Sequence, residues 1–177
     1  MILFLNGPFG VGKTSAARVL VEEIPASMLY DPEVIGCVLQ RTLGRVKKVD
    51  DYQDSALWRR LVVGVARALR AVSARTLVIP MTVWRRDYFA PIVAGLRRVD
   101  QNLRCFRLTA SERELKRRIA SDSDDTGAYG WRVAHVEGLH ERFARSGLRD
   151  GSADGRPCAR WGRWQEPEER KHTDRLG

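Results

Sequence analysis

Short apolar runs alternate with longer amphipathic segments along most of the chain. Apolar positions three or four residues apart are typical of a helix, whereas a short continuous apolar run is typical of a buried strand. The predicted strands are residues 1–5, 27–30, 76–80 and 103–108, and the predicted helices are residues 15–23, 31–43, 55–72, 88–99, 111–120 and 131–145. This alternation predicts an α/β fold with a parallel sheet and helices on both faces.

Local signals define several of these helices more closely. Pro32 stands at the first position of the second helix, where its fixed φ angle is tolerated. Residues 111–114, Ser-Glu-Arg-Glu, match a capping box at the start of the fifth helix. One stripe of the helix at residues 55–72 is expected to face the core, and it consists of Leu57, Leu61, Val65 and Leu69.

Three segments have no such pattern. Residues 44–54 are predicted to form a polar loop, and residues 121–130 are polar and expected to form a mobile lid. Residues 146–177 contain no apolar run of strand length and are predicted to be an irregular tail. We therefore expect one folded domain at residues 1–145, followed by this tail.

A glycine-rich loop follows the first predicted strand, and residues 7–14 match the pattern G-x-x-x-x-G-K-[ST]. A strand, such a loop and a helix start together form a cradle whose backbone amides hold phosphate groups. Lys13 is expected to reach the β- and γ-phosphates of ATP, and the Thr14 hydroxyl to bind Mg²⁺. The alternative is an ordinary glycine turn. The predicted cradle consists of Gly7, Pro8, Phe9, Gly10, Val11, Gly12, Lys13, Thr14 and Ser15.

Composition and charge narrow the classes of partner. The 177 residues carry a formal charge of +9, and residues 61–140 hold most of the excess, with 14 basic and 8 acidic side chains. This excess suits a polyanion such as ATP. No basic run interleaved with aromatic residues favours nucleic acid, so no nucleic-acid partner is expected. The partner expected is a small molecule, and the oligomeric state is not predicted.

The cysteines and the first residues indicate a compartment. The three cysteines lack a C-x-x-C pair, which fits a reducing compartment and argues against a disulfide framework or a zinc site. The first strand and the loop leave no room for a signal peptide, and no apolar run approaches the roughly 20 residues of a membrane span. A cytoplasmic location is the default prediction, with peripheral contact with a membrane left open.

Two sequence motifs that are absent distinguish among the classes of protein with such a phosphate-binding loop (P-loop). The chain has no N-K-x-D motif for guanine, which disfavours a GTPase. The third strand ends in Val-Ile-Pro-Met at residues 78–81, without the carboxylate that helps to hold Mg²⁺ in many P-loop ATPases. Both points favour a small-molecule kinase that uses Mg²⁺ and ATP.

Asp31 is the first candidate for catalysis. The carboxyl ends of parallel strands lie at one edge of the sheet, and this should bring Asn6, Asp31 and Thr82 to one cleft. An aspartate there can accept the proton of an attacking hydroxyl. The alternative, with equal weight, is that Asp31 only caps the following helix, and one residue can do both. Glu33 is a weaker substitute for the same role.

Residues 50–54, followed by Trp58, Arg59 and Arg60, are a second candidate. Carboxylates, an amide and aromatic rings suit a polyhydroxyl or nucleoside substrate, although composition alone favours a solvated loop. The predicted substrate-binding residues are Asp31, Glu33, Gln53, Asp54, Trp58 and Thr82.

Basic residues next to the expected lid are candidates for contact with phosphates. Arg117 and Arg118 lie nearest to it and are favoured for stabilising transition-state charge, although a solvated helix face is the commoner role for any single arginine. Arg85 and Arg86 are weaker candidates for binding an anionic substrate.

Several of these segments together resemble one known family. The chain resembles tunicamycin-resistance proteins in the order and spacing of four segments over about residues 1–120. These segments are residues 4–14, Tyr30 to Glu33, Asp51 to Asp54 with Trp58-Arg59, and residues 78–82, Val-Ile-Pro-Met-Thr. The phosphate loop alone is generic, whereas the Asp-x-Gln-Asp and Pro-Met-Thr segments are more specific.

The resemblance implies a fold like that of nucleoside-monophosphate kinases, with about five parallel strands and a mobile lid. It also implies ATP binding and resistance to tunicamycin, a nucleoside antibiotic with sugars and an acyl chain, through phosphorylation of a hydroxyl. Three alternatives are a kinase of a sugar acid, of shikimate or of a nucleoside, and a fourth is a protein that sequesters the antibiotic without turnover. Residues 146–177 depart from this pattern, because they offer no apolar fifth strand.

Overall fold

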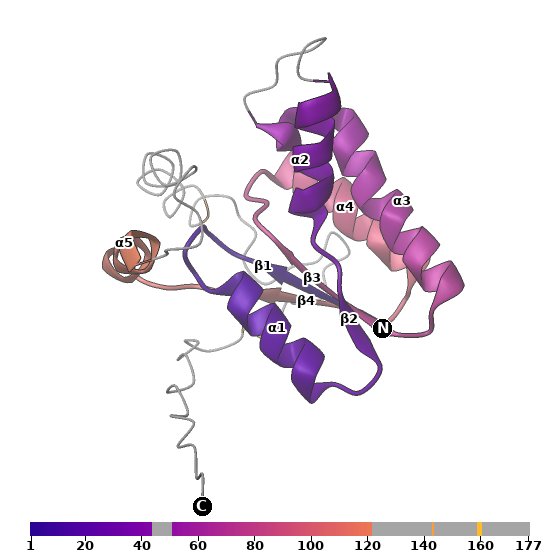
Figure 1. Cartoon of the computed structure of the whole chain (residues 1–177), viewed down its shortest axis with the longest axis horizontal. Coiled ribbons are helices and arrows are strands. Elements are labelled where there is room, and N and C mark those ends of the chain that lie inside the picture. Colours follow the sequence, from indigo (N-terminus) through magenta and orange to yellow (C-terminus); the bar gives the residue numbers. More distant parts are fainter. Residues whose placement is uncertain (44–50, 122–142, 144–158, 161–177) are drawn as a thin grey trace, which may run out of the picture.

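The computed structural model describes residues 1–43, 51–121, 143 and 159–160. The described residues form a parallel sheet of five strands in the order β2-β3-β1-β4-β5. Figure 1 shows β1, β2, β3 and β4 at the centre of the molecule. The strands are β1 (Ile2–Asn6), β2 (Ser27–Leu29), β3 (Thr76–Met81), β4 (Leu103–Arg107) and β5 (Ala159–Arg160). The helices are α1 (Lys13–Glu23), α2 (Pro32–Leu43), α3 (Ala56–Val72), α4 (Arg86–Val99) and α5 (Glu112–Ser121), with a 3₁₀ helix, η1 (Tyr52–Asp54).

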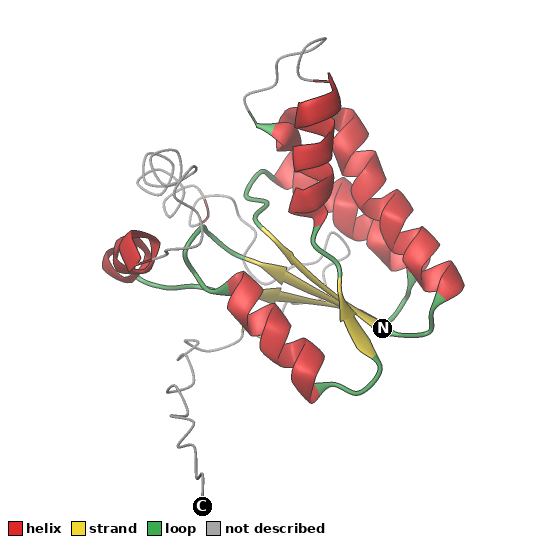
Figure 2. Cartoon of the chain, in the orientation of Figure 1, coloured by secondary structure: helices red, strands yellow, loops and turns green. Residues whose placement is uncertain are grey.

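The predicted α/β fold with helices on both faces of a parallel sheet is confirmed (Figure 2). The central strand β1 explains the two layers, because its side chains alternate between the faces. Ile2 and Phe4 pack in the cluster formed with α3 and α4. Leu3 and Leu5 pack in a second cluster, formed with α1 and α5.

The stripe predicted for α3 is partly right. Val65 and Leu69 are partly buried against the core, whereas Leu57 is 45% exposed, and the fully buried residues of α3 are Trp58, Val62 and Ala66. The large indole of Trp58 decides the rotation of the helix, since its burial removes more apolar surface from water than that of a leucine.

Segment boundaries differ from the prediction at two informative places. The helix α1 begins at Lys13 rather than Ser15, because Gly12, with φ 90°, serves as its N-cap. The predicted irregular tail contains a strand, since Ala159–Arg160 pairs in parallel with Phe106 and Arg107 of β4. A two-residue strand held by backbone hydrogen bonds needs no apolar run, so the hydrophobic pattern could not reveal it.

The topology places a switch point between β1 and β3, where open parallel sheets form their ligand crevice. The strand β1 is followed by α1, which packs on one face of the sheet, and β3 is followed by α4, which packs on the other. Because β1 and β3 are paired, the chain leaves their carboxyl ends in opposite directions. Ligands of open parallel sheets bind at such a switch point.

Three predicted features fall mainly outside the described residues: the lid at residues 121–130, the helix at residues 131–145 and most of the tail. Within that helix only Phe143 is described, and it is helical and buried. No helix in the described part of the chain is long and apolar enough to cross a membrane.

Candidate functional site

The glycine loop has the backbone geometry that its sequence predicts. Gly10 and Gly12 have φ angles of 74° and 90°, in the left-handed region that glycine adopts without strain. A Cβ atom on Gly10 would also lie 2.8 Å from Cγ1 of Ile119 and 3.0 Å from the carbonyl oxygen of Leu115. The loop is therefore packed tightly against α5.

Lys13 and the start of α1 fit an anionic ligand. The Lys13 side chain is only 8% exposed, and its Nζ donates a hydrogen bond to the carbonyl oxygen of Pro8 at 2.9 Å, next to the Phe9 ring. No described side chain caps α1, so its first backbone amides and the positive end of the helix dipole are available to phosphate oxygens. This arrangement fits the phosphates of ATP.

Thr14 and Ser15 lie exposed in the first turn of α1. Within the described ranges, no three His, Cys, Asp or Glu side chains group to hold a metal ion. Mg²⁺ commonly keeps several waters and takes only one or two protein ligands besides phosphates, so a single hydroxyl such as that of Thr14 fits this ion.

Asn6 joins the two strands that border the crevice. Its Nδ2 donates to the carbonyl oxygen of Val83 at 2.8 Å, and its Oδ1 accepts from the backbone amides of Val83 and Gly7, each at 2.9 Å. The side chain thus ties the start of the phosphate loop to the chain that follows β3.

Thr82 lies beside this junction and is 1% exposed. Its Oγ1 has no hydrogen-bond partner among the described residues. A buried hydroxyl left in this state costs about 1–3 kcal/mol, so such groups are uncommon and need an explanation.

Asp31 caps α2, as one of its two predicted roles requires. Its Oδ1 accepts a hydrogen bond from the backbone amide of Glu33 at 2.9 Å, and the residue is half-buried. The cap leaves the second carboxylate oxygen for another role, so capping and proton transfer are compatible.

Tyr52 lies at the centre of a group of carboxylates. Burial raises the pKa of Tyr52 far above its usual range, and the charges of Glu33, Asp51 and Asp31 raise it further. A Cβ atom on Gly36 would lie 2.6 Å from the Tyr52 ring, so this glycine lets η1 pack against α2. The structure therefore brings the predicted residues of α2 together with the segment before α3.

Two predicted substrate-binding residues in this region are buried. Gln53 is buried, and its backbone amide donates to Oδ1 of Asp51 at 2.8 Å. Trp58 is buried in the core, with its Nε1 donating to the carbonyl oxygen of Pro32 at 3.0 Å. Trp58 is thus a core residue that holds α3 against α2, which corrects its prediction as a substrate contact.

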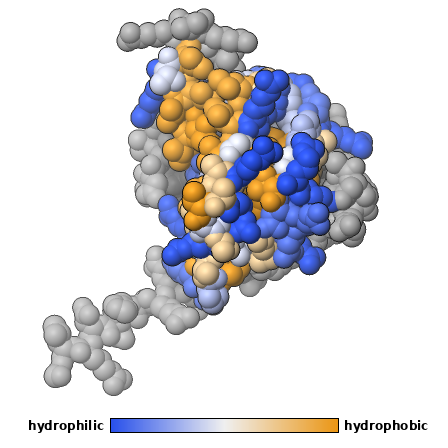
Figure 3. Space-filling model, turned by 90° about the vertical axis from the view of Figure 1, so that its right-hand side faces the viewer, coloured by the Kyte–Doolittle hydropathy of each residue, from blue (hydrophilic) through white to orange (hydrophobic). Residues whose placement is uncertain are grey.

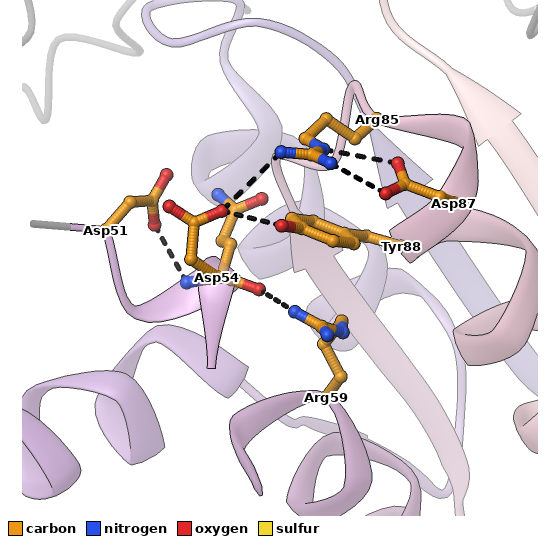
Figure 4. A network of polar contacts seen from close by, with 7 residues as sticks. Asp51, Asp54, Arg59, Arg85, Asp87 and Tyr88 are labelled. Carbon is orange, nitrogen blue, oxygen red and sulfur yellow. Dashed lines mark hydrogen bonds and ion pairs between the residues drawn. The ribbon is translucent and has the colours of Figure 1, made fainter. Parts of the chain in front are cut away.

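Asp54 belongs to an exposed polar network at the start of α4 (Figure 4). Its Oδ1 accepts a hydrogen bond from the Tyr88 hydroxyl at 2.7 Å and lies 3.8 Å from NH1 of Arg85, which also pairs with Asp87 at 2.7 Å. The guanidinium carbons of Arg59 and Arg85 lie 4.0 Å and 4.2 Å from the Tyr88 ring centre. The hydrogen bond to Asp54, followed by burial, raises the pKa of Tyr88.

Tyr88 was not among the predicted site residues, whereas Arg59 was predicted as part of the second candidate stretch, without its contact with Tyr88. The two residues lie 29 positions apart, and no spacing rule relates a first-turn arginine of one helix to a tyrosine of the next. Only the pairing of α3 with α4 brings them together.

The two lid-side arginines have different surroundings. NH1 of Arg118 donates to the carbonyl oxygen of Val11 at 3.2 Å and Nε donates to Oε1 of Glu114 at 2.6 Å, with the side chain 15% exposed. Arg117 is 65% exposed and pairs with Glu114. These bonds lower the pKa of Glu114 to about 2. Arg118 therefore lies at the phosphate loop, and Arg117 faces away from the core.

Apolar side chains are exposed along α2, beyond its capping residue Asp31. Val34, Val38 and Leu43 of this helix are exposed, as is Leu57 in the first turn of α3. Figure 3 shows a continuous apolar area on this side of the molecule, beside strongly polar surface. The carboxylate group around Tyr52 therefore borders an apolar surface.

The loop at the β1–β3 crevice of a parallel sheet defines a P-loop nucleotide-binding fold of the kinase-like class. Residues 2–145 match the family described as AAA domain, and the chain belongs to this family. A comparison with curated proteins found no match.

Solved structures with a similar fold include the tunicamycin resistance protein of Deinococcus radiodurans, which is 26% identical with a TM-score of 0.60 over 81% of this chain and 83% of that chain. A sugar kinase from a Janibacter species is 16% identical with a TM-score of 0.51 over 80% and 90% of the two chains. A gluconokinase from Sinorhizobium meliloti is 17% identical with a TM-score of 0.51 over 76% and 72%. The resemblance to tunicamycin-resistance proteins is confirmed, and the two kinases are similar in fold.

Proposed function

We propose that this protein is an ATP-dependent phosphotransferase that modifies a hydroxyl group of a nucleoside antibiotic of the tunicamycin type. One observation carries the proposal: Lys13 is buried in the loop after β1, no side chain caps α1, and Asp31 follows β2, whose carboxyl end lies at the same edge of the parallel sheet. A phosphate-binding loop opposite a half-buried carboxylate is the arrangement that phosphoryl transfer to a hydroxyl needs.

The nucleotide side of the site is formed by the loop. Its backbone amides and Lys13 hold the phosphate oxygens, Thr14 binds Mg²⁺, and Arg118 reaches the loop from α5. Bound ATP supplies the phosphoryl group, and Mg²⁺ offsets the charge on it.

The acceptor side is formed by α2 and the segment before α3. Asp31 accepts the proton of the attacking hydroxyl, with Glu33 beside it, and Asp54 orients the substrate. The apolar surface along α2 supports an acceptor with an aliphatic part, which suits an antibiotic that carries an acyl chain.

The proposed function is tested by ADP release on addition of acceptors to the protein with Mg²⁺ and ATP. The panel contains tunicamycin, a nucleoside, gluconate and shikimate, and the variants are Lys13→Ala and its matched control Lys116→Ala, whose amine pairs with Glu112 on the surface. We expect release with tunicamycin only, lost in Lys13→Ala and kept in Lys116→Ala. Release with gluconate or shikimate instead would identify a metabolite kinase, and ATP-dependent binding of tunicamycin without ADP would identify a sequestering protein.

A further inference from the structure

Thr82 stands at the place where the crevice meets the phosphate loop. It directly follows β3, and its hydroxyl is buried without a hydrogen-bond partner in the described part of the chain. The next residue, Val83, is bonded through both its backbone groups to Asn6, which in turn bonds the amide of Gly7. Thr82 is therefore held next to the first residue of the loop.

The neighbours of Thr82 fix the direction of its side chain. Met81 and Val83 both belong to the cluster packed against α3 and α4. Val78, farther back in β3, belongs to the opposite cluster together with Ala16 of α1. Because side chains of an extended chain alternate between faces, Thr82 extends on the side of α1 and the phosphate loop.

This position has a known chemical use in related folds. In P-loop proteins a carboxylate after a neighbouring strand helps to hold Mg²⁺, together with the loop hydroxyl. Here residues 80–82 are Pro-Met-Thr, so the acidic group is replaced by a hydroxyl. Mg²⁺ keeps several bound waters, and a hydroxyl can accept a hydrogen bond from one of them.

We propose that the Thr82 hydroxyl binds a water molecule in the coordination shell of the magnesium ion that accompanies ATP. This inference rests on the proposed nucleotide site, and it moves Thr82 from the acceptor side, where sequence analysis placed it, to the metal side. Thr82 is then a positioning residue that supports Mg²⁺ in place of a carboxylate.

The test is calorimetric binding of ATP at increasing Mg²⁺ concentration and in EDTA, for wild type, Thr82→Val and Thr82→Ser. The control is Thr109→Val, an exposed threonine that follows β4. We expect Thr82→Val to bind ATP in EDTA as tightly as wild type does. Because one hydrogen bond to the magnesium-bound water is lost, this variant should need about tenfold more Mg²⁺ to reach half of the magnesium-dependent gain in ATP affinity. Thr82→Ser and Thr109→Val should behave as wild type.

Three results would overturn the inference. An unchanged Mg²⁺ titration with a raised KM for the acceptor would place Thr82 on the acceptor side. An equal loss of ATP binding with and without Mg²⁺, in Thr82→Val and in the smaller Thr82→Ala, would make it a packing residue. If the wild-type protein binds no ATP, the proposed function fails. If the wild type binds ATP and Thr82→Val shows the same Mg²⁺ dependence, only the role of Thr82 fails.

Discussion

The Asn6 side chain forms hydrogen bonds with both backbone groups of Val83, although 77 positions separate the two residues. The amide group donates to one backbone group of Val83 and accepts from the other, at 2.8 Å and 2.9 Å. The pair therefore extends the β1–β3 pairing beyond the last residue of β3. Because Asn6 also accepts from Gly7, the geometry of the phosphate loop depends on this contact.

Replacing this buried amide should reduce both stability and nucleotide binding. Asn6→Ala leaves buried backbone groups of Val83 and Gly7 without partners, and we expect a loss of about 3 kcal/mol in the free energy of unfolding. Urea denaturation measures it, with Asn102→Ala, at an exposed asparagine, as the matched control. Equal stability of the two variants would show that the Asn6 contact does not hold the crevice.

Capping and catalysis by Asp31 can be separated by substitution. Asparagine and serine cap helices about as well as aspartate, so Asp31→Asn and Asp31→Ser should fold and bind ATP. If the carboxylate accepts a proton, both variants should lose phosphoryl transfer by about 10²- to 10⁴-fold.

The measurement is single-turnover transfer together with thermal unfolding. Asp31→Ala is the control for the cap alone and should lose about 1 kcal/mol of stability. Full transfer activity in Asp31→Ser would limit the residue to its hydrogen bond with Glu33.

Two helical glycines should respond to alanine with opposite signs. A Cβ on Gly36 would lie 2.6 Å from the Tyr52 ring, and the resulting overpacking should cost about 1–3 kcal/mol. A Cβ on Gly64 has no atom within 4 Å, and alanine there should stabilise α3 by about 0.5–1 kcal/mol.

Denaturant titration of both variants measures these effects, and the KM for the acceptor shows whether displacing Tyr52 disturbs the site. A Gly36→Ala protein more stable than wild type would mean that η1 is not packed on α2 as described.

The pairing of Glu114 with Arg117 and Arg118 should depend on pH in one direction. Those hydrogen bonds lower the pKa of Glu114 to about 2. A lowered carboxyl pKa adds stability above the unfolded pKa, about 4.3, and this stability is lost as the pH falls toward 2.

The difference in unfolding free energy between wild type and Glu114→Gln should therefore shrink steadily between those pH values. Because the Glu114 side chain is 31% exposed and Arg117 is 65% exposed, salt should screen part of this effect. A Glu114 carboxyl that titrates at its ordinary pKa in an NMR experiment would contradict the pairing.

Much of the fold was predictable because its signals are local. The phosphate loop needs a fixed spacing of glycines and Lys13, and the two central strands β1 and β3 are mostly apolar runs. The Ser111 cap of α5 is also local, since its Oγ accepts from the amide of Glu114 at 3.3 Å.

What could not be predicted depends on contacts between distant segments. The sequence does not show which side of α3 faces the core, so it could not predict that Trp58 is buried. Tyr88 lies between Arg59 and Arg85 only because α3 packs against α4. The strand Ala159–Arg160 carries no side-chain pattern at all.

The most direct measurement is mass spectrometry of tunicamycin after incubation with the purified protein, Mg²⁺ and ATP, with Lys13→Ala in parallel. The account predicts that the drug gains the mass of one phosphoryl group with wild type and remains unchanged with Lys13→Ala. A drug left unmodified by a wild-type protein that binds both ATP and tunicamycin would contradict it.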